Sequence, residues 1–334
     1  VLTSSAASDV YKRQAHIQEQ RRQRAAQKAE TELSGAAEAA QHQGRVVVRH
    51  GQNLIVSTSA GEPVHCLFRQ NLGEVVCGDR VLWQSTADGR GVVVALLPRD
   101  STLSRPDYSG RGKPIAANIS QLVVVLAPQP EPAGYLLDQY LVAAERIGVK
   151  ALICLNKADL LDEHGRDAFM QRFAHYEALG YPLVQVSAKS EHGLQPLLER
   201  LRHNTSILVA QSGVGKSSLN NAILPSERAE EGRLSDSTGL GRHTTSAATL
   251  YRLHSGGEII DSPGVRSFRL GKLERRELEY GYPELRELIG ECRFSNCSHT
   301  DEPGCAVKAA AAAGRIHPDR LASFLHMAEQ LQPS

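Results

Sequence analysis

Short apolar runs separated by turn residues fill the chain between Arg45 and Leu97. The five runs cover residues 46–48, 54–56, 64–68, 80–83 and 91–97, with glycine, proline or aspartate between them. Five short strands in about 55 residues predict a small closed all-β barrel of OB type over 45–98, a scaffold that often binds RNA. A barrel that only packs against its neighbour is the alternative, since Phe68 and Trp83 are almost the only aromatic residues available for base stacking.

A different pattern begins at residue 119, where continuous apolar runs alternate with helical spacing. Runs at 121–126, 151–155, 183–187 and 207–209 are typical of buried strands, whereas 137–147 repeats apolar residues every three or four positions. This alternation predicts an α/β domain over 119–274. The intervening residues 99–118, rich in arginine, glycine and proline, are predicted to be a basic linker.

The carboxyl-terminal part predicts a helical domain over 275–334. Residues 306–313 end at Gly314 like a capped helix, and a second helix over 318–331 starts at Pro318. This second helix has one apolar face, which we expect to pack within its own domain rather than against a partner; the face consists of Leu321, Phe324, Leu325, Ala328 and Leu331.

A phosphate-binding loop follows the apolar run at 207–209 and precedes a helical pattern. Two glycines let backbone N–H groups turn towards a phosphate, a lysine adds positive charge, and the next hydroxyl can ligate Mg²⁺. The helix that follows presents its amino terminus to the anion. Ala210 stands where the pattern has glycine, from which we expect altered loop strain more than lost binding; a glycine-rich turn without a ligand is the alternative. The loop reads Ala210, Gln211, Ser212, Gly213, Val214, Gly215, Lys216, Ser217 and Ser218.

A guanine-recognition motif ends the apolar run at 151–155. It reads Asn156, Lys157, Ala158 and Asp159. The aspartate can accept hydrogen bonds from the guanine N1–H and the exocyclic amine, while the asparagine and lysine brace the loop and cover the ring. A second guanine loop ends the next strand, where a backbone N–H can bind the guanine O6; it reads Ser187, Ala188 and Lys189.

Two more nucleotide-dependent segments follow the phosphate loop. The first, 239–245, is a glycine-flanked segment that ends in Thr245, and the second is a strand that leads into Asp261 and Gly264. Asp261 suits an outer-shell Mg²⁺ position, and Gly264 offers a backbone N–H to the γ-phosphate. Guanine recognition thus precedes the phosphate loop, the reverse of the usual order, as in a circular permutation.

With these motifs in this order, residues 45–330 resemble the RsgA family of circularly permuted GTPases, which act in maturation of the bacterial small ribosomal subunit. The resemblance implies a fold of three parts, namely a permuted P-loop GTPase domain, an amino-terminal OB-type barrel and a carboxyl-terminal helical zinc-binding domain. It also implies GTP or GDP and Mg²⁺ as ligands, the small (30S) subunit with its 16S rRNA as partner, and a monomer. For the Mg²⁺ ligands it favours Ser217 and Thr245, the latter over Thr244.

Catalysis must differ from that of GTPases with a glutamine after the D-x-x-G motif. Val265 occupies that place and cannot orient water through its side chain. His243 is the candidate for orienting the water, and Lys216 and Thr245 are the other predicted catalytic residues. A structural or RNA-facing role for this histidine is the alternative. We expect hydrolysis to be slow until a ribosomal surface orders this loop.

Four metal-binding side chains lie within fourteen residues near the carboxyl end. They are Cys292, Cys297, His299 and Cys305. A Cys₃His set suits tetrahedral structural zinc and leaves no open position for catalysis. The chemistry and the family resemblance carry this assignment together, because the spacing differs from finger signatures; a disulfide or a chance cluster is the alternative.

Composition adds limits to this interpretation. The 38 lysines and arginines nearly balance 37 acidic residues, so any RNA-binding surface must be local, as in the basic segment 12–28. We expect residues 1–44 to be a disordered basic extension, with 1–14 extraneous; a solvated tail without a partner is the alternative for this arm. Cys66, Cys77 and Cys154 lie singly in apolar segments, as in a reducing compartment. No membrane span or signal peptide is visible, which predicts a cytoplasmic protein.

Two rival functions remain open at this stage. One is a non-catalytic RNA-binding switch protein that binds GTP and GDP but hardly hydrolyses GTP. The other is a P-loop ATPase or small-molecule kinase, which the motif at 156–159 disfavours.

Overall fold

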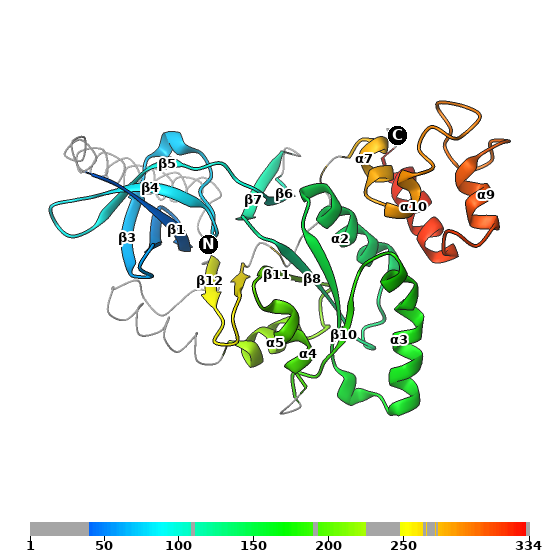
Figure 1. Cartoon of the computed structure of the whole chain (residues 1–334), viewed down its shortest axis with the longest axis horizontal. Helices are drawn as coiled ribbons and strands as arrows, with labels where there is room; N and C mark the ends of the chain where they lie inside the picture. Colours follow the sequence, from blue (N-terminus) through cyan, green and yellow to red (C-terminus); the bar gives the residue numbers. More distant parts are fainter. Residues whose placement is uncertain are drawn as a thin grey trace, which may run out of the picture. The chain divides into compact units, whose positions relative to one another are not determined.

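A computed structural model describes residues 40–107, 111–189, 193–224, 248–262, 265, 271 and 273–331 of the 334-residue chain. The chain divides into two compact units, one of Val1–Val75 with Asp79–Pro98 and the other of Val76–Gly78 with Arg99–Ser334. Figure 1 shows the elements of both. Each unit is described separately below.

The first unit is a closed barrel of five strands, which confirms the barrel predicted from the apolar runs. Neighbouring strands pair antiparallel except for β3 and β5, which are parallel, and the pairing of β1 with β4 closes the ring. β1 begins four residues before the predicted start of the barrel. The strands are β1 (Gln41–His50), β2 (Asn53–Thr58), β3 (Pro63–Phe68), β4 (Arg80–Ser85) and β5 (Gly91–Leu96), with a 3₁₀ turn, η1, at Gln70–Leu72.

Alternating side chains from these strands fill the barrel. Val46, Val56 and Val81 are fully buried, and Trp83 is 7% exposed. Phe68 packs against the same cluster. Both aromatic residues considered for base stacking therefore contribute to the core, because inward-facing positions of a small barrel must be filled by large side chains.

The segment predicted as a linker contains a β-hairpin. β6 (Thr102–Pro106) pairs antiparallel with β7 (Gly112–Ala117), and Leu103 and Ile115 are buried. Glycine, proline and arginine around the hairpin concealed it in the sequence, since its apolar positions are few. Arg105 lies opposite Lys113 in the register.

The second unit is built on six strands in the order β10-β9-β8-β11-β13-β12. All neighbours are parallel except β12 and β13, which are antiparallel. Every residue of β8 is buried, as expected for a strand covered on both faces. The strands are β8 (Gln121–Leu126), β9 (Lys150–Leu155), β10 (Leu183–Gln185), β11 (Thr205–Ala210), β12 (Ala248–Arg252) and β13 (Glu258–Asp261).

One group of helices accompanies this sheet, and a second group forms the carboxyl-terminal module. Those of the sheet are α2 (Gly134–Ile147), η2 (Ala158–Leu160), α3 (Glu163–Ala178), α4 (Gln195–Leu201) and α5 (Lys216–Ile223). Those of the module, here residues 273–331, are α7 (Arg275–Tyr280), α8 (Pro283–Arg286), α9 (Ala306–Ala312) and α10 (Pro318–Gln330). The apolar face of α10 packs within the module, where Phe324 is fully buried. No helix in the described part of the chain is both long and apolar enough to span a bilayer.

Candidate functional site: nucleotide loops and a Cys₃His cluster

The phosphate loop connects the central strand β11 to helix α5. β11 ends at Ala210 and α5 begins at Lys216, as the motif predicts. Gly213 and Gly215 have φ angles of 87° and 91°, a region that favours glycine. A methyl group at Gly215 would also lie 2.7 Å from the Asn156 amide nitrogen. Both glycines are therefore required by the backbone of this loop.

Ala210 is a strand residue and needs no glycine. It pairs with Val125 of β8, its side chain is 6% exposed, and its φ angle is not positive. The methyl group belongs to the hydrophobic core beneath the loop. The loop strain expected from Ala210 has no basis in this geometry, because ordinary strand backbone accepts alanine.

The guanine-recognition loop after β9 is hydrogen-bonded to the phosphate loop. Asn156 Nδ2 donates to the Val214 carbonyl at 3.0 Å, and Lys157 Nζ donates to the Gly213 carbonyl at 2.8 Å. The same ammonium donates to the carbonyl of Gln129 at 2.8 Å. Two segments more than 50 residues apart are thereby held in one arrangement by the protein's own groups.

Asp159 and the second guanine loop also meet. The Ser187 hydroxyl donates to Asp159 Oδ1 at 2.7 Å and accepts from the Lys189 backbone N–H at 3.2 Å. Asp159 is exposed, whereas Ser187 is 4% exposed. A buried hydroxyl thus orients an exposed carboxylate, which suits recognition of a base that offers adjacent N–H donors.

The remaining nucleotide-site residues are only partly described. Lys216 and Ser217 open α5, and the Ser217 side chain is exposed, as a metal-binding hydroxyl must be. Asp261 ends β13 at the same edge of the sheet, where ligands of open α/β sheets bind. Val265 is 1% exposed, so its side chain belongs to the interior. Gly264 and residues 239–245, which include His243 and Thr245, lie outside the described residues.

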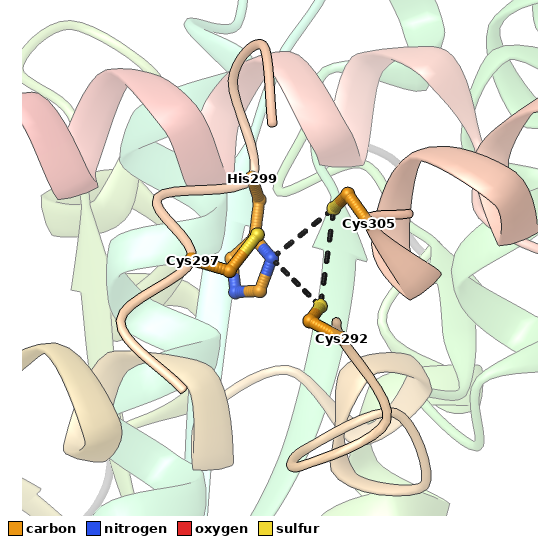
Figure 2. Close-up of side chains that lie close together, drawn as sticks. All are labelled: Cys292, Cys297, His299 and Cys305. Carbon is orange, nitrogen blue, oxygen red and sulfur yellow. Dashed lines mark hydrogen bonds between the residues drawn. The ribbon is translucent and has the colours of Figure 1, made fainter. Parts of the chain in front are cut away.

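The four predicted metal ligands converge in the carboxyl-terminal module (Figure 2). Their ligand atoms all lie within 4.8 Å of one another. His299 Nδ1 is 3.6 Å from Cys292 Sγ and 3.4 Å from Cys305 Sγ, and these two sulfurs are 4.0 Å apart. Tetrahedral zinc with bonds of about 2.3 Å to sulfur separates its ligand atoms by about 3.8 Å, so the spacing fits such an ion.

An acidic side chain outside the cluster orients its histidine. Nε2 of His299 faces Glu279 Oε1 at 3.3 Å, and Arg275 Nε lies 3.4 Å from the same oxygen. The hydrogen bond that Glu279 accepts from His299 raises the pKa of His299 to about 9, while burial raises the pKa of the Cys297 thiol to about 12. Nδ1 faces the sulfurs of Cys292 and Cys305 and is the nitrogen placed to bind a metal, while Glu279 beside Nε2 favours a proton there. Sequence reasoning missed Glu279, because a glutamate twenty positions before a histidine forms no recognisable pattern.

Comparisons with known proteins agree with this geometry. The family model described as RsgA GTPase matches residues 96–271, about half of the chain. A relative from Hahella chejuensis, named small ribosomal subunit biogenesis GTPase RsgA, is 45% identical over 323 residues, which are 95% of this chain and 93% of the relative. The chain belongs to the RsgA GTPase family. The RsgA relative from Azotobacter vinelandii is 46% identical, with 94% of each chain covered.

Two solved structures share the RsgA-family fold. YjeQ from Thermotoga maritima is 33% identical with a TM-score of 0.71, over 87% of this chain and 99% of that one. YloQ, titled a circularly permuted GTPase, is 28% identical with a TM-score of 0.69, over 88% of this chain and 97% of that one. The circular permutation inferred from motif order is confirmed by this likeness. This RsgA-family chain is accordingly a GTP-hydrolysing enzyme of ribosome biogenesis, and its family implies guanine nucleotide and Mg²⁺ as ligands.

Proposed function

We propose that this protein binds the small ribosomal subunit through its 16S rRNA and acts late in the maturation of that subunit. GTP hydrolysis, stimulated by the subunit, then releases the protein. The observation that carries the proposal is the likeness over 94–95% of the chain to proteins named small ribosomal subunit biogenesis GTPases. The nucleotide loops supply the chemistry, because they bring guanine-recognition and phosphate-binding groups to one edge of the sheet. We assign these activities to a monomeric cytoplasmic protein.

In this proposal the described loops and the two switch segments share the nucleotide. Asn156–Asp159 and Ser187–Lys189 recognise guanine, while residues 210–218 hold the phosphates. Ser217 and Thr245 ligate Mg²⁺, with Asp261 in its outer shell and Gly264 on the γ-phosphate. His243 orients the attacking water, since Val265 cannot.

The zinc ion has a structural role in this proposal. Four protein ligands fill a tetrahedral set, which leaves no position for substrate. The Cys₃His cluster and its partner Glu279 join the turns of a short module whose helices α7 to α9 are at most seven residues long.

Charged residues are unevenly distributed along the chain. Residues 40–98 contain five arginines, no lysine and four acidic residues, and the ion pairs within the barrel include Arg49 with Glu74 and Arg90 with Asp88. Residues 273–331 contain seven basic and ten acidic residues. We therefore assign the electrostatic share of RNA binding mainly to residues 12–28 and to the β6–β7 hairpin, with the barrel contributing shape.

Two measurements test the proposal. GTP turnover should rise when purified small subunits are added, whereas large subunits serve as the control and should leave it unchanged. ATP should not compete with labelled GTP for binding to the protein. Equal turnover with and without small subunits would instead favour a GTP-binding switch protein that hydrolyses little.

Binding provides the second test. Co-sedimentation with small subunits should be strong with a non-hydrolysable GTP analogue and weak with GDP. His243→Ala should retain this binding but lose the stimulated turnover. Unchanged stimulated turnover in His243→Ala would exclude the role assigned to this histidine.

A further inference from the structure

The carboxyl-terminal module rests on α2 of the GTPase fold through a shared hydrophobic core. Val142 of α2 belongs to the same buried cluster as Phe324 of α10 and Leu278 of α7. The backbones also approach closely, since a methyl group at Gly281 would lie 2.6 Å from Val142 Cγ1. The module is therefore packed against the GTPase fold through α2.

One fully buried arginine lies at the centre of this contact. Arg320 of α10 is 0% exposed, and its Nη1 donates to Asp138 Oδ1 of α2 at 2.5 Å. Its Nε and Nη2 donate to both carboxylate oxygens of Glu284 in the module, at 2.7 and 3.0 Å. Asp138 is itself fully buried. One guanidinium thus pairs with a carboxylate on each side of the contact.

Aromatic rings enclose this ion cluster. The Arg320 guanidinium carbon lies 4.1 Å from the centre of the Tyr282 ring and 5.5 Å from that of Tyr176. The Tyr176 hydroxyl, from α3, donates to Asp138 Oδ1 at 3.0 Å. Burial and the Asp138 carboxylate raise the pKa of Tyr176, which keeps it a donor. Separating the two sides would break the bond from Arg320 to Asp138 and would expose to water the apolar cluster that Val142 shares with the module.

Polar contacts at the edge of the contact fix its orientation. Arg146 of α2 pairs with Glu277 of α7 at 2.9 Å, and Arg286 of α8 pairs with Glu145 of α2.

Two imidazoles, His175 of α3 and His317 at the start of α10, also stack in parallel with ring centres 3.7 Å apart. Three elements of the module are therefore held to α2, and α10 is also held to α3.

Helix α2 in turn is connected to the nucleotide loops. The loop that leads into α2 contains Gln129, whose carbonyl accepts from Lys157, and Pro130, which lies 3.3 Å from the position of a methyl group at Gly213. The module is thus docked on the helix whose preceding loop braces the phosphate loop.

We infer that the carboxyl-terminal module and the GTPase fold move as one body through the nucleotide cycle, with Arg320 as the residue that fixes the module's position. The opposing possibility is that the segment after Asp261 swings the module when the γ-phosphate is bound or lost. That motion would have to break the Arg320 cluster, whereas motion as one body leaves it intact. The inference concerns the chain alone and does not depend on ribosome binding.

Distance measurements between spin labels test the inference on the full chain with zinc bound. Labels are placed at two exposed positions, Asp167→Cys on α3 and Ala312→Cys on α9. We expect the same distance distribution with GDP and with a non-hydrolysable GTP analogue. A nucleotide-dependent shift in this distance would overturn the inference.

Variants of Arg320 test the residue itself. Arg320→Ala should lower the melting temperature by about 10 °C and broaden the distance distribution. Arg320→Lys keeps the charge but loses the fork that reaches both carboxylates, so it should give a smaller change in the same direction. Arg315→Ala, an exposed arginine before α10, is the matched control and should change neither property. Arg320 variants with the distribution and melting temperature of the parent would remove Arg320 from this role.

A cross-link keeps the test valid if Arg320→Ala fails to fold. Tyr135 of α2 and His326 of α10 have ring centres 5.3 Å apart at the edge of the contact. Cysteines at these two positions, joined by a short bismaleimide, should change the affinities for GDP and the GTP analogue by about twofold at most. If the cross-linked protein bound the GTP analogue more weakly while its affinity for GDP stayed the same, thermodynamic linkage would show that the module must move when the analogue binds.

Discussion

The nucleotide loops and the Cys₃His cluster are both assembled from loops, but different groups hold them. Side chains of Asn156 and Lys157 donate to backbone carbonyls of the phosphate loop, so the nucleotide loops support one another without a ligand. The cluster instead brings together three cysteine sulfurs and an imidazole, whose ligand atoms lie within 4.8 Å of one another. Cysteine sulfurs are weak hydrogen-bonding groups. The comparison indicates that the first site is preorganised by the protein, whereas the second needs its metal.

Metal removal should reveal the largest difference between the nucleotide loops and the Cys₃His cluster. A chelator that strips zinc, or Cys297→Ser, should unfold the turns around residues 292–305, because structural zinc contributes about 10 kcal/mol to the folding of such modules. Circular dichroism and NMR should show this loss, and the free metal should match one zinc per chain. Nucleotide removal, the parallel treatment, should leave the fold intact. A chelated protein with an unchanged NMR spectrum would contradict the comparison.

Loss of the guanine-binding carboxylate should cost affinity but not structure. Asp159→Ala removes the acceptor for two guanine donors, so GTP affinity should fall about 100-fold or more by titration calorimetry. Asp162→Ala, the matched control, removes the amino-terminal cap of α3, where Asp162 accepts from the Gly165 N–H. It should lower stability by about 1 kcal/mol and leave affinity unchanged. Equal losses of affinity in both variants would mean that Asp159 acts through the fold.

The histidine partner provides a graded test of the metal site. Glu279→Ala should lower zinc affinity about 10- to 100-fold in a competition with a chromogenic chelator. Glu279→Gln keeps an acceptor and should lose less. Glu287→Ala, at an exposed position of the same module, serves as the control for a missing negative charge. Unaltered affinity in Glu279→Ala would show that the cluster orients His299 unaided.

Acid should weaken the attachment of the module through His175. Burial, with further contributions from His317 and Arg320, lowers the pKa of His175 to about 4, below its unfolded value near 6.5. The folded state therefore requires the neutral ring, and its stability is complete above pH 6.5 and falls as pH drops towards 4. Melting curves of the zinc-loaded protein and of His175→Gln, recorded from pH 7.5 to 4.5, should converge or cross as pH falls. A stability difference independent of pH would contradict this role.

Restoring glycine at Ala210 should have the smallest effect. The variant loses a buried methyl group and introduces a glycine within a strand. Together these changes should lower the free energy of unfolding by about 1–2 kcal/mol, which corresponds to roughly 4 °C in melting temperature. Nucleotide affinity should stay the same, because Ala210 precedes the turns of the loop. Tighter GTP binding in Ala210→Gly would show that the methyl group strains the phosphate loop after all.

Much of the candidate site could be predicted from the sequence because its chemistry is local. The loop at 210–218 and the motif at 156–159 are contiguous, and each follows an apolar run that became a strand. The β6–β7 hairpin was missed because its two strands carry few apolar residues. Glu279 and Arg320 were missed because their roles depend on partners from other elements, such as His299 and Asp138.

The sequence by itself determined most of the strands, the order of the motifs and the four metal-binding residues, since periodicity and short spacing are properties of consecutive residues. Only the tertiary structure decided what holds those motifs in place. Lys157 reaches the phosphate loop, Glu279 reaches His299, and Arg320 joins α10 to α2 across 182 residues. Such contacts depend on how β8 to β11 and their helices pack, and no spacing along the chain encodes them.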